Sequence, residues 1–278
     1  MSLIIDSYYR SKKKGFQNVN LAKHTQDTLL YTVFFPQLIA GPIVKWNMFS
    51  PQIGPKKISD IDWIYCARCL IIGYFLKIYV ADNLTDTLVW FRYPYFLEKS
   101  KVTLWFSLFA YSIQIFADFG GYSLIALGLA GLFGYRLPVN FNAPYLARNM
   151  SDFWGRWHIT LSQWLRQYLF NPLALSAKRK GRVGVSAFIA VMVLGGIWHG
   201  ASWNFAIWGV LHGLFLTVAY YYSTFTKWKM PTILGIFLTF GCVSISWIFF
   251  AIPKFDHSLM YIQSLFHNSG PLDVGSYF

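Results

Sequence analysis

The chain has 278 residues, of which 55% are hydrophobic, 20% aromatic and only 13% charged. Soluble domains usually carry about a quarter charged residues, so this composition excludes an ordinary soluble protein and indicates one whose apolar surface faces lipid. The formal charge of +13 would fit nucleic-acid binding only if it lay along one soluble face. The basic residues instead form short clusters between apolar segments, so we expect membrane lipid and no nucleic acid as a partner.

The first half of the chain predicts membrane helices interrupted by polar or small residues. Residues 1–28 are polar and basic, which indicates a loop, and they lack the apolar core of a signal peptide. Residues 29–44 are apolar but contain two prolines and a glycine, which predicts a broken or re-entrant helix. Three further stretches predict helices in the bilayer: 61–81, 102–117 and the shorter 124–135. Asp118, Gly120 and Gly121 predict a break before the last of these.

A proline- and asparagine-containing connection at 136–148 leads into an amphipathic segment. Asn149 and Asp152 resemble a capping pair, and a single helix is predicted over about 152–170. Its polar stripe consists of Asp152, Arg156, Thr160, Gln163 and Gln167. This helix is too polar to cross lipid alone, so we expect it to lie in the interface or to line an internal cavity.

Three apolar stretches complete the set, at 183–198, 203–222 and 233–252. By length the chain predicts about five clear spans and two partial ones, and therefore an all-α polytopic membrane bundle. The tail from Pro253 has no obvious closing element. Charge does not decide the topology: if 124–135 crosses fully, the basic cluster at 178–182 lies opposite Lys56 and Lys57, unless the amphipathic segment re-enters.

The most informative residue is His199, which lies between two predicted apolar helices in the sequence GGIWHGASW. An ionisable side chain at membrane depth indicates function by default, although a hydrogen-bonded packing histidine is an equally weighted alternative. Moving an acyl group from a thioester to a sugar hydroxyl requires a general base, and imidazole suits that task near neutral pH. Burial would keep the ring neutral, and the neighbouring glycines would let an acyl donor approach the backbone.

Other polar residues at membrane depth leave alternatives open. His158 either orients an acceptor or stabilises developing negative charge, or it is an interfacial amphipathic side chain. His212 is expected to be a packing or tunnel-lining residue, and Asp118 either caps a helix break or faces a tunnel. No metal site is predicted, because His199 and His212 are too far apart to share one helix face and no carboxylate cluster accompanies them.

Five stretches in the same order along the chain resemble the membrane-bound O-acyltransferase family. They are FFPQLIAGPIV at 34–44, DFGGYS at 118–123, LGLAGLFGYRLPVNFNAPYL at 127–146, SDFWGRWHITLSQWLRQYLFNPL at 151–173 and GGIWHGASWNFAIWGVLHG at 195–213. The resemblance is closest to the branch that contains the alginate O-acetylase membrane subunit. It implies a multi-helix bundle around a central tunnel in which re-entrant or interfacial helices meet.

The resemblance also implies which residues act. His199 corresponds to the family's near-universal histidine and His158 to its second histidine, so both are candidate catalytic residues. The further candidates for lining the substrate tunnel are Asp118, Arg156, Trp157, Trp198 and Asn204. Leu124 and Gln167 stand where family members often carry aspartate.

The activity implied is transfer of an acetyl or other short acyl group from a thioester donor, with acetyl-CoA as donor and no bound cofactor. The acceptors are hydroxyls of an exopolysaccharide such as alginate, reached across the bacterial cytoplasmic (inner) membrane directly or through a periplasmic partner acetyltransferase. Family members are usually longer, so residues 1–278 are expected to be one domain that lacks N-terminal helices and possibly a C-terminal element. Two alternatives stay open: an export component whose histidines relay protons, and a non-catalytic scaffold for a periplasmic acetyltransferase.

Overall fold

The computed structural model describes residues 4–6, 8, 20–38, 41–179 and 185–268. Over these residues the chain is all-α, with helices and no strand, so the predicted fold class is confirmed. The helices long and apolar enough to cross a membrane are Trp63–Thr85, Lys101–Leu132, Trp203–Phe225 and Thr232–Ala251. A further apolar helix, Val185–His199, is shorter. Five clear spans were expected from the sequence. Over the described residues, four of them are helices long enough to cross a membrane and the fifth is a shorter apolar helix.

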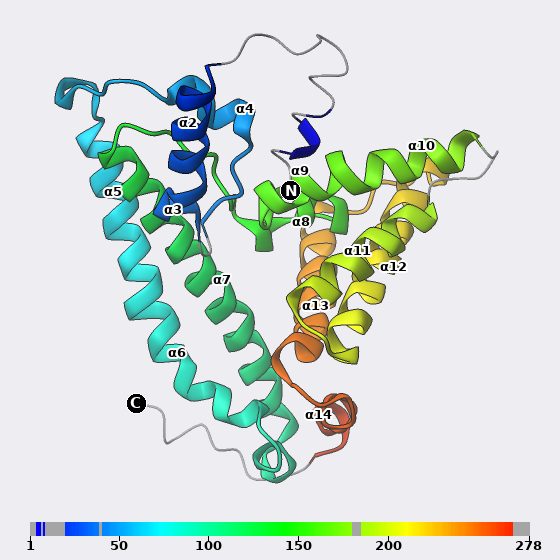
Figure 1. The fold of residues 1–278 in the computed structure, drawn as a ribbon. Coiled ribbons are helices and arrows are strands. Elements are labelled where there is room, and N and C mark those ends of the chain that lie inside the picture. Colours follow the sequence, from blue (N-terminus) through cyan, green and yellow to red (C-terminus); the bar gives the residue numbers. More distant parts are fainter. Residues whose placement is uncertain (1–3, 7, 9–19, 39–40, 180–184, 269–278) are drawn as a thin grey trace.

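The first group of helices forms one side of the molecule (Figure 1). Its elements are α2 (Leu21–Val33), α3 (Phe35–Leu38), α4 (Trp46–Phe49), α5 (Trp63–Tyr74), the π-helical segment η3 (Phe75–Asp82), α6 (Asn83–Thr85) and α7 (Lys101–Leu132). Residues 21–33 are helical rather than part of a loop, because the Asn20 side chain caps α2 by accepting a hydrogen bond from the Lys23 amide at 3.2 Å. The break predicted within 29–44 is confirmed, since α2 ends before α3.

The second group begins at the upper end and forms the other side (Figure 1). Its elements are α8 (Met150–Arg156), α9 (Ile159–Leu165), the π-helical segment η7 (Arg166–Phe170), α10 (Asn171–Arg179), α11 (Val185–His199), α12 (Trp203–Phe225), α13 (Thr232–Ala251) and α14 (Phe255–His267). The expectation that the tail has no closing element is wrong, because it forms α14. Tyr261 of this helix donates its hydroxyl to the carbonyl of Leu104 at 3.0 Å, which ties α14 to α7.

The break predicted around Asp118, Gly120 and Gly121 is also wrong, because α7 is continuous. A Cβ on Gly121 would lie 2.8 Å from the carbonyl oxygen of Gly73 on α5. The small residues therefore permit close packing of two helices instead of ending one. Asp118 forms an ion pair with Lys77 of η3 across the same helix pair.

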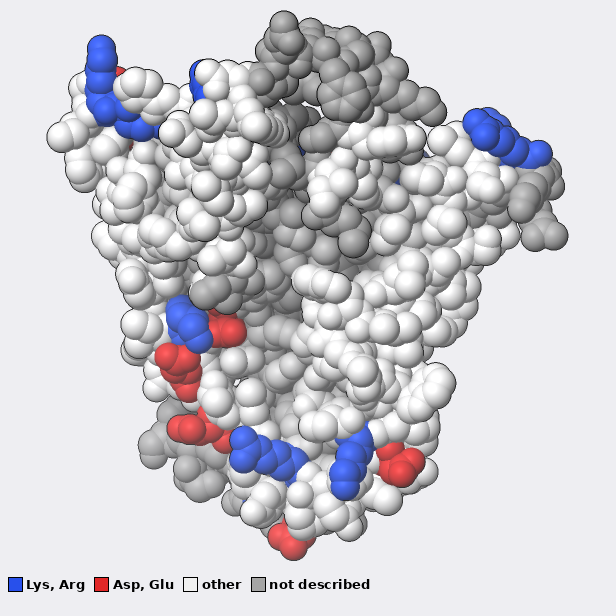
Figure 2. Space-filling model, in the orientation of Figure 1, with Lys and Arg blue, Asp and Glu red and all other residues white. Residues whose placement is uncertain are grey.

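The two ends of the molecule differ in charge (Figure 2). Helix α7 crosses fully, but α8, α9 and α10 stay at the end where it finishes, and α12 returns to that end antiparallel to α11. The basic residues gathered there include Lys56, Lys57, Lys178, Arg179, Lys227 and Lys229, and they outnumber the acidic Asp27, Asp60 and Asp62 at the same end. The opposite end has a more even balance, with Arg92, Glu98, Lys254 and Asp256 among its charges. Residues 102–117 and 124–135 thus form one crossing, α7, instead of two. Lys178 and Arg179 therefore lie at the same end as Lys56 and Lys57 without re-entry of the amphipathic segment.

An aromatic core fills the space between α8, α12 and α13. Its buried indoles are those of Trp154, Trp157, Trp208 and Trp247. The rings of Trp208 and Trp247 are stacked, with centroids 6.0 Å apart. Large buried aromatic side chains contribute strongly to packing, so this core holds the α8–α9 junction and the α11–α12 turn in fixed positions.

Candidate active site

The turn between α11 and α12 determines where His199 lies. Helix α11 ends at His199, and the next residue, Gly200, donates its amide to the carbonyl of Ile197 at 3.2 Å. Ser202 then caps α12, because its hydroxyl accepts a hydrogen bond from the Asn204 amide at 3.3 Å. The His199 ring is therefore presented at a helix end, on a short turn with both sides anchored.

Glycines bring the two helices of this hairpin close together. A Cβ on Gly196 would lie 2.1 Å from the carbonyl oxygen of Phe205, and one on Gly209 would lie 2.4 Å from that of Met192. A side chain at either position would push α11 away from α12. Helix packing thus accounts for these glycines, whereas the sequence had led us to expect space for an acyl donor.

The His199 side chain is surrounded by aromatic rings on its protein side and is exposed on the other. Its ring centroid lies 5.1 Å from that of Phe250 and 5.7 Å from that of Trp208, both edge-on. The neighbouring Trp198 is 66% exposed. The imidazole is therefore reachable from outside the packed core, as a base that meets a substrate must be.

His158 lies in a strained turn instead of inside a helix. The single helix predicted over about 152–170 is wrong, because α8 ends at Arg156 and α9 begins at Ile159. Between them His158 has a φ of +43°, in the left-handed region that is costly for residues other than glycine. Its side chain is only 7% exposed. Strained backbone that the surrounding structure maintains is typical of functional sites.

Asn140 holds the His158 ring. Its Oδ1 atom lies 3.0 Å from His158 Nδ1 and also accepts hydrogen bonds from the amide and the hydroxyl of Thr160. Its Nδ2 atom donates to the hydroxyl of Ser123 on α7 at 3.2 Å. The Thr160 hydroxyl in turn accepts from the amide of Ile43 at 2.9 Å. One buried amide thus joins α7, α9 and the segment after α3.

This network assigns the tautomer of His158. Because the backbone amide of Thr160 can only donate, the Asn140 atom that it contacts is the oxygen, and His158 Nδ1 must carry the proton that bonds to it. In a neutral ring the other nitrogen, Nε2, then has a free lone pair. His158 is therefore poised to accept a hydrogen bond or a proton, and not to donate one to an oxyanion.

His158 and His199 are 41 positions apart in sequence, yet both border the aromatic core. The first lies at the α8–α9 junction next to Trp157, and the second at the end of α11, with its ring centroid 5.7 Å from that of Trp208. An imidazole with an assigned acceptor nitrogen and an exposed imidazole at a helix end are each suited to general-base chemistry.

His212 has a structural role. It is fully buried, its Nδ1 atom accepts the indole N–H of Trp154 at 3.3 Å, and its Nε2 atom lies 2.8 Å from the hydroxyl of Ser246. That hydroxyl donates to the carbonyl of Val243, so Nε2 carries the proton. Both nitrogens are satisfied inside the core, and the packing interpretation of His212 is confirmed.

The structure places Arg156 in a local ion pair. Its Nε atom lies 2.7 Å from Asp152 Oδ1, and a second nitrogen donates to the carbonyl of Asn142. Burial alone would raise the pKa of the Asp152 carboxyl, but hydrogen bonds from Arg156 and from the Arg148 amide hold that pKa below its ordinary value. Arg156 therefore braces the end of α8.

The other predicted tunnel residues lie in different surroundings. Trp157 is buried against Phe153 and Trp247 in the aromatic core. Asn204 is buried, and its amide nitrogen donates to the carbonyl of Ile252 and to Ser258, so it fastens α12 to the start of α14. Asp118, paired with Lys77, stays a tunnel prediction, as does Trp198.

The sequence interpretation missed Asn140. The signal was present in the NFN of the extended connection, where buried asparagine has no other reason to occur. Among the described residues no three His, Cys, Asp or Glu side chains come together as a metal site would require.

Comparison with known proteins decides the family. The model of the membrane-bound O-acyltransferase family matches residues 16–260. The chain belongs to this family. It is 39% identical over 87% of its length to the peptidoglycan O-acetyltransferase of Helicobacter pylori, of which it covers 47%.

The names of other relatives specify other polymers. The chain is 34% identical over 90% of its length to a probable alginate O-acetylase of Pseudomonas syringae, and it covers 46% of that protein. It is 29% identical over 87% of its length to the teichoic acid D-alanyltransferase of Bacillus subtilis, and it covers 68% of it. This O-acyltransferase domain thus spans about half the length of the O-acetylating relatives that it matches.

Proposed function

We propose that this chain carries the acyl-transfer centre of a membrane O-acyltransferase that acetylates a cell-surface glycan. The observation that carries the proposal is the pair of histidines that border the aromatic core: His199 is exposed at a helix end, and His158 has its Nδ1–H committed to Asn140 and no Nε2 partner among the described residues. The names of the relatives support acyl transfer to hydroxyls of surface polymers.

In the proposed reaction His199 removes the proton from an acceptor hydroxyl as its oxygen attacks the carbonyl of a thioester, with acetyl-CoA as donor. A C–O bond forms, the C–S bond breaks, and the proton on His199 passes to the leaving thiolate, so charge and atoms balance. His158 accepts a hydrogen bond from a neighbouring hydroxyl of the sugar through Nε2 and so orients the acceptor.

The polymer is proposed from the relatives. The names of both O-acetylating relatives specify an acetyl group but different glycans. The chain is 39% identical to the peptidoglycan enzyme and 34% identical to the alginate one. Peptidoglycan is therefore the first acceptor to test, and alginate is the second.

The charge distribution supports an orientation in the membrane. The positive-inside rule places the end with Lys56, Lys57, Lys178 and Arg179 in the cytoplasm. In a bacterial inner membrane this lets the thioester arrive from the cytoplasm and the glycan, or a periplasmic partner acetyltransferase, from the opposite side.

The test is His199→Ala in the full-length protein in its native host, with glycan O-acetylation measured after alkaline release of acetate. We expect acetylation to fall at least 100-fold, because general-base catalysis contributes about 10²–10⁴-fold. His267→Ala is the matched control, since His267 is an exposed histidine at the end of α14. Protein level and glycan amount should stay unchanged for both variants.

Other outcomes distinguish the alternatives. If His199→Ala abolishes glycan export itself, the chain is a transport component. If acetylation persists, the chain is a scaffold for another enzyme and the proposal is wrong.

A further inference from the structure

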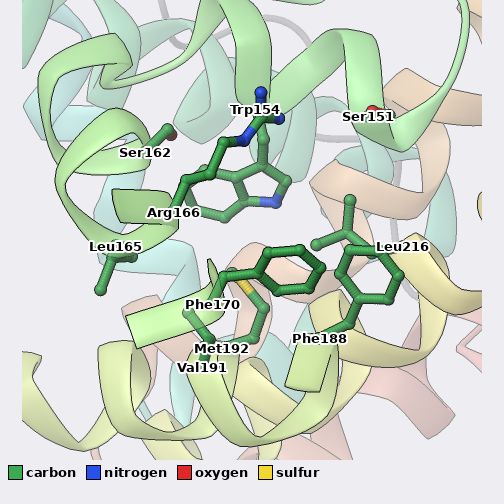
Figure 3. Close-up of a pocket in the computed structure, with 10 residues that line it drawn as sticks. All are labelled: Ser151, Trp154, Ser162, Leu165, Arg166, Phe170, Phe188, Val191, Met192 and Leu216. Atoms are coloured by element: carbon green, nitrogen blue, oxygen red, sulfur yellow. The ribbon is translucent and has the colours of Figure 1, made fainter. Parts of the chain in front are cut away.

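A half-open cavity of about 240 Å³ lies between α8, α9, η7, α11 and α12 (Figure 3). Its walls are apolar and consist mainly of Trp154, Leu165, Phe188, Val191, Met192 and Leu216. Apolar cavities of about 150 Å³ already hold benzene-sized molecules. This one therefore has room for several carbons of a hydrocarbon chain.

The polar groups of the cavity lie on one side, where α8, α9 and η7 meet. They are the hydroxyls of Ser151 and Ser162 and the guanidinium of Arg166. Figure 3 shows the Arg166 side chain extending along the indole of Trp154. Among the described residues Arg166 forms no ion pair. A cation without a carboxylate partner at the rim of an apolar cavity is complementary to an anionic headgroup.

The depth of these groups in the membrane fits the same ligand. Arg166 begins η7, which leads directly into α10, an amphipathic helix that lies across the upper end of the molecule and finishes with Lys178 and Arg179. Such a helix lies at the level of lipid headgroups. The apolar wall comes from the middle of α11, which descends from that level. The cavity thus offers positive charge at headgroup depth and apolar surface below it.

We propose that this cavity binds one anionic phospholipid, with its phosphate on Arg166 and the upper part of an acyl chain against Val191 and Met192. The proposal does not rest on the transferase activity, because it needs only the placement of this end at the membrane surface. The lipid chain would pack on Trp154, whose indole contacts Trp208 beside His199, so occupancy would brace the aromatic core of the site.

The experiment uses the purified full-length protein in phosphatidylcholine micelles, to which phosphatidylglycerol is added as the probe. Wild-type protein is expected to retain one phosphatidylglycerol in native mass spectrometry and to melt about 5 °C higher with it. Arg166→Gln should weaken this binding about tenfold, as loss of one charged hydrogen bond does. Arg136→Gln is the control, because it removes an equal charge from an exposed position after α7 that does not line the cavity.

Two further experiments test the contribution of the acyl chain and whether free phosphate can replace the lipid. Val191→Phe should fill the cavity and abolish phosphatidylglycerol binding while the melting temperature in phosphatidylcholine alone stays within a few degrees of wild type. If that variant does not fold, the mass-spectrometric comparison of wild type with Arg166→Gln decides. Inorganic phosphate at millimolar concentration should not stabilise the protein.

Three results would overturn the proposal. Equal binding of phosphatidylglycerol and phosphatidylcholine by wild type would remove the role of charge. An equal loss of phosphatidylglycerol binding in Arg166→Gln and Arg136→Gln would indicate that the lipid is attracted only by the overall positive charge of the surface. Absence of bound phosphatidylglycerol on the wild-type protein would show that the cavity does not hold this lipid.

Discussion

His158 donates its Nδ1–H to Oδ1 of Asn140, which lies 18 positions earlier in the chain, over 3.0 Å. This bond crosses from the extended connection to the α8–α9 junction and leaves His158 Nε2 as the free nitrogen. The orientation of a candidate catalytic ring thus depends on a residue that carries out no chemistry itself.

Asn140→Leu should lower kcat of glycan acetylation by about 10- to 100-fold, below the full effect of losing a general base. The two side chains have the same branching and number of heavy atoms, so the loss reflects mainly the freed imidazole and the unpaired Thr160 amide. KM for the thioester should change little, because Asn140 acts through His158. Asn142→Leu, two residues away and exposed, is the control. A purely structural role would lower protein yield and leave the kcat of the surviving protein unchanged.

Gly196→Ala should destabilise the protein by about 2 kcal/mol or more, since its Cβ would meet the Phe205 carbonyl and force α11 from α12. Because His199 lies three residues on, activity should also fall. Gly241→Ala in α13 has open space around the new methyl group and should be neutral or stabilising by up to about 1 kcal/mol. Thermal unfolding in detergent measures both variants, and equal effects would contradict the packing argument.

Trp154→Phe removes a side-chain hydrogen bond, whereas Trp208→Phe removes none among the described residues. The Trp154 indole donates to His212, whereas the buried Trp208 N–H has no acceptor among the described residues. Trp154→Phe leaves His212 Nδ1 unsatisfied and should cost about 1–3 kcal/mol more stability than Trp208→Phe. Both changes remove similar ring area, so the difference between their unfolding free energies isolates the bond. A smaller loss for Trp154→Phe would show that the Trp154–His212 bond contributes nothing.

The ion pair between Lys77 and Asp118 predicts coupling between α5–η3 and α7. Lys77→Met leaves the Asp118 carboxylate without this partner, and insertion scales place a lone charge at about 2.5–3.5 kcal/mol at the bilayer centre. Asp118→Leu costs less, because Lys77 keeps a second carboxylate, Asp82, at 3.6 Å. Both side chains are partly exposed, at 37% and 43%, so we expect a coupling energy of only about 1 kcal/mol in a double-mutant cycle. Unfolding in bicelles supplies the four free energies. Strict additivity would show that the two charges are stabilised independently.

Element type followed well from the sequence where long apolar stretches occurred. The spans expected at 203–222 and 233–252 agree with α12 and α13 within a few residues, because roughly 20 apolar residues are stable in lipid only as a helix. The position of the basic residues 178–182 relative to Lys56 and Lys57 did not follow from composition, because it depended on whether 102–117 and 124–135 crossed the membrane once or twice. Residues 180–184 lie outside those that the structure describes.

The prediction was wrong at glycines and polar residues whose packing or hydrogen-bond partners lie far away in the sequence. Gly121 predicts a break if it is considered alone, but opposite Gly73 it lets two helices touch. The apolar spacing on both sides of His158 predicts one continuous helix, yet Asn140 and Thr160 stabilise a turn there.

By itself the sequence determined the membrane environment, the all-α class and the two histidines, since these depend on local composition and on motifs of adjacent residues. Only the tertiary structure decided that His158 and His199 both border the aromatic core, that Asn140 assigns the tautomer of His158, and that Arg166 borders an apolar cavity. Each of these depends on contacts between residues distant in the chain, and such contacts arise from side-chain packing that no local pattern encodes.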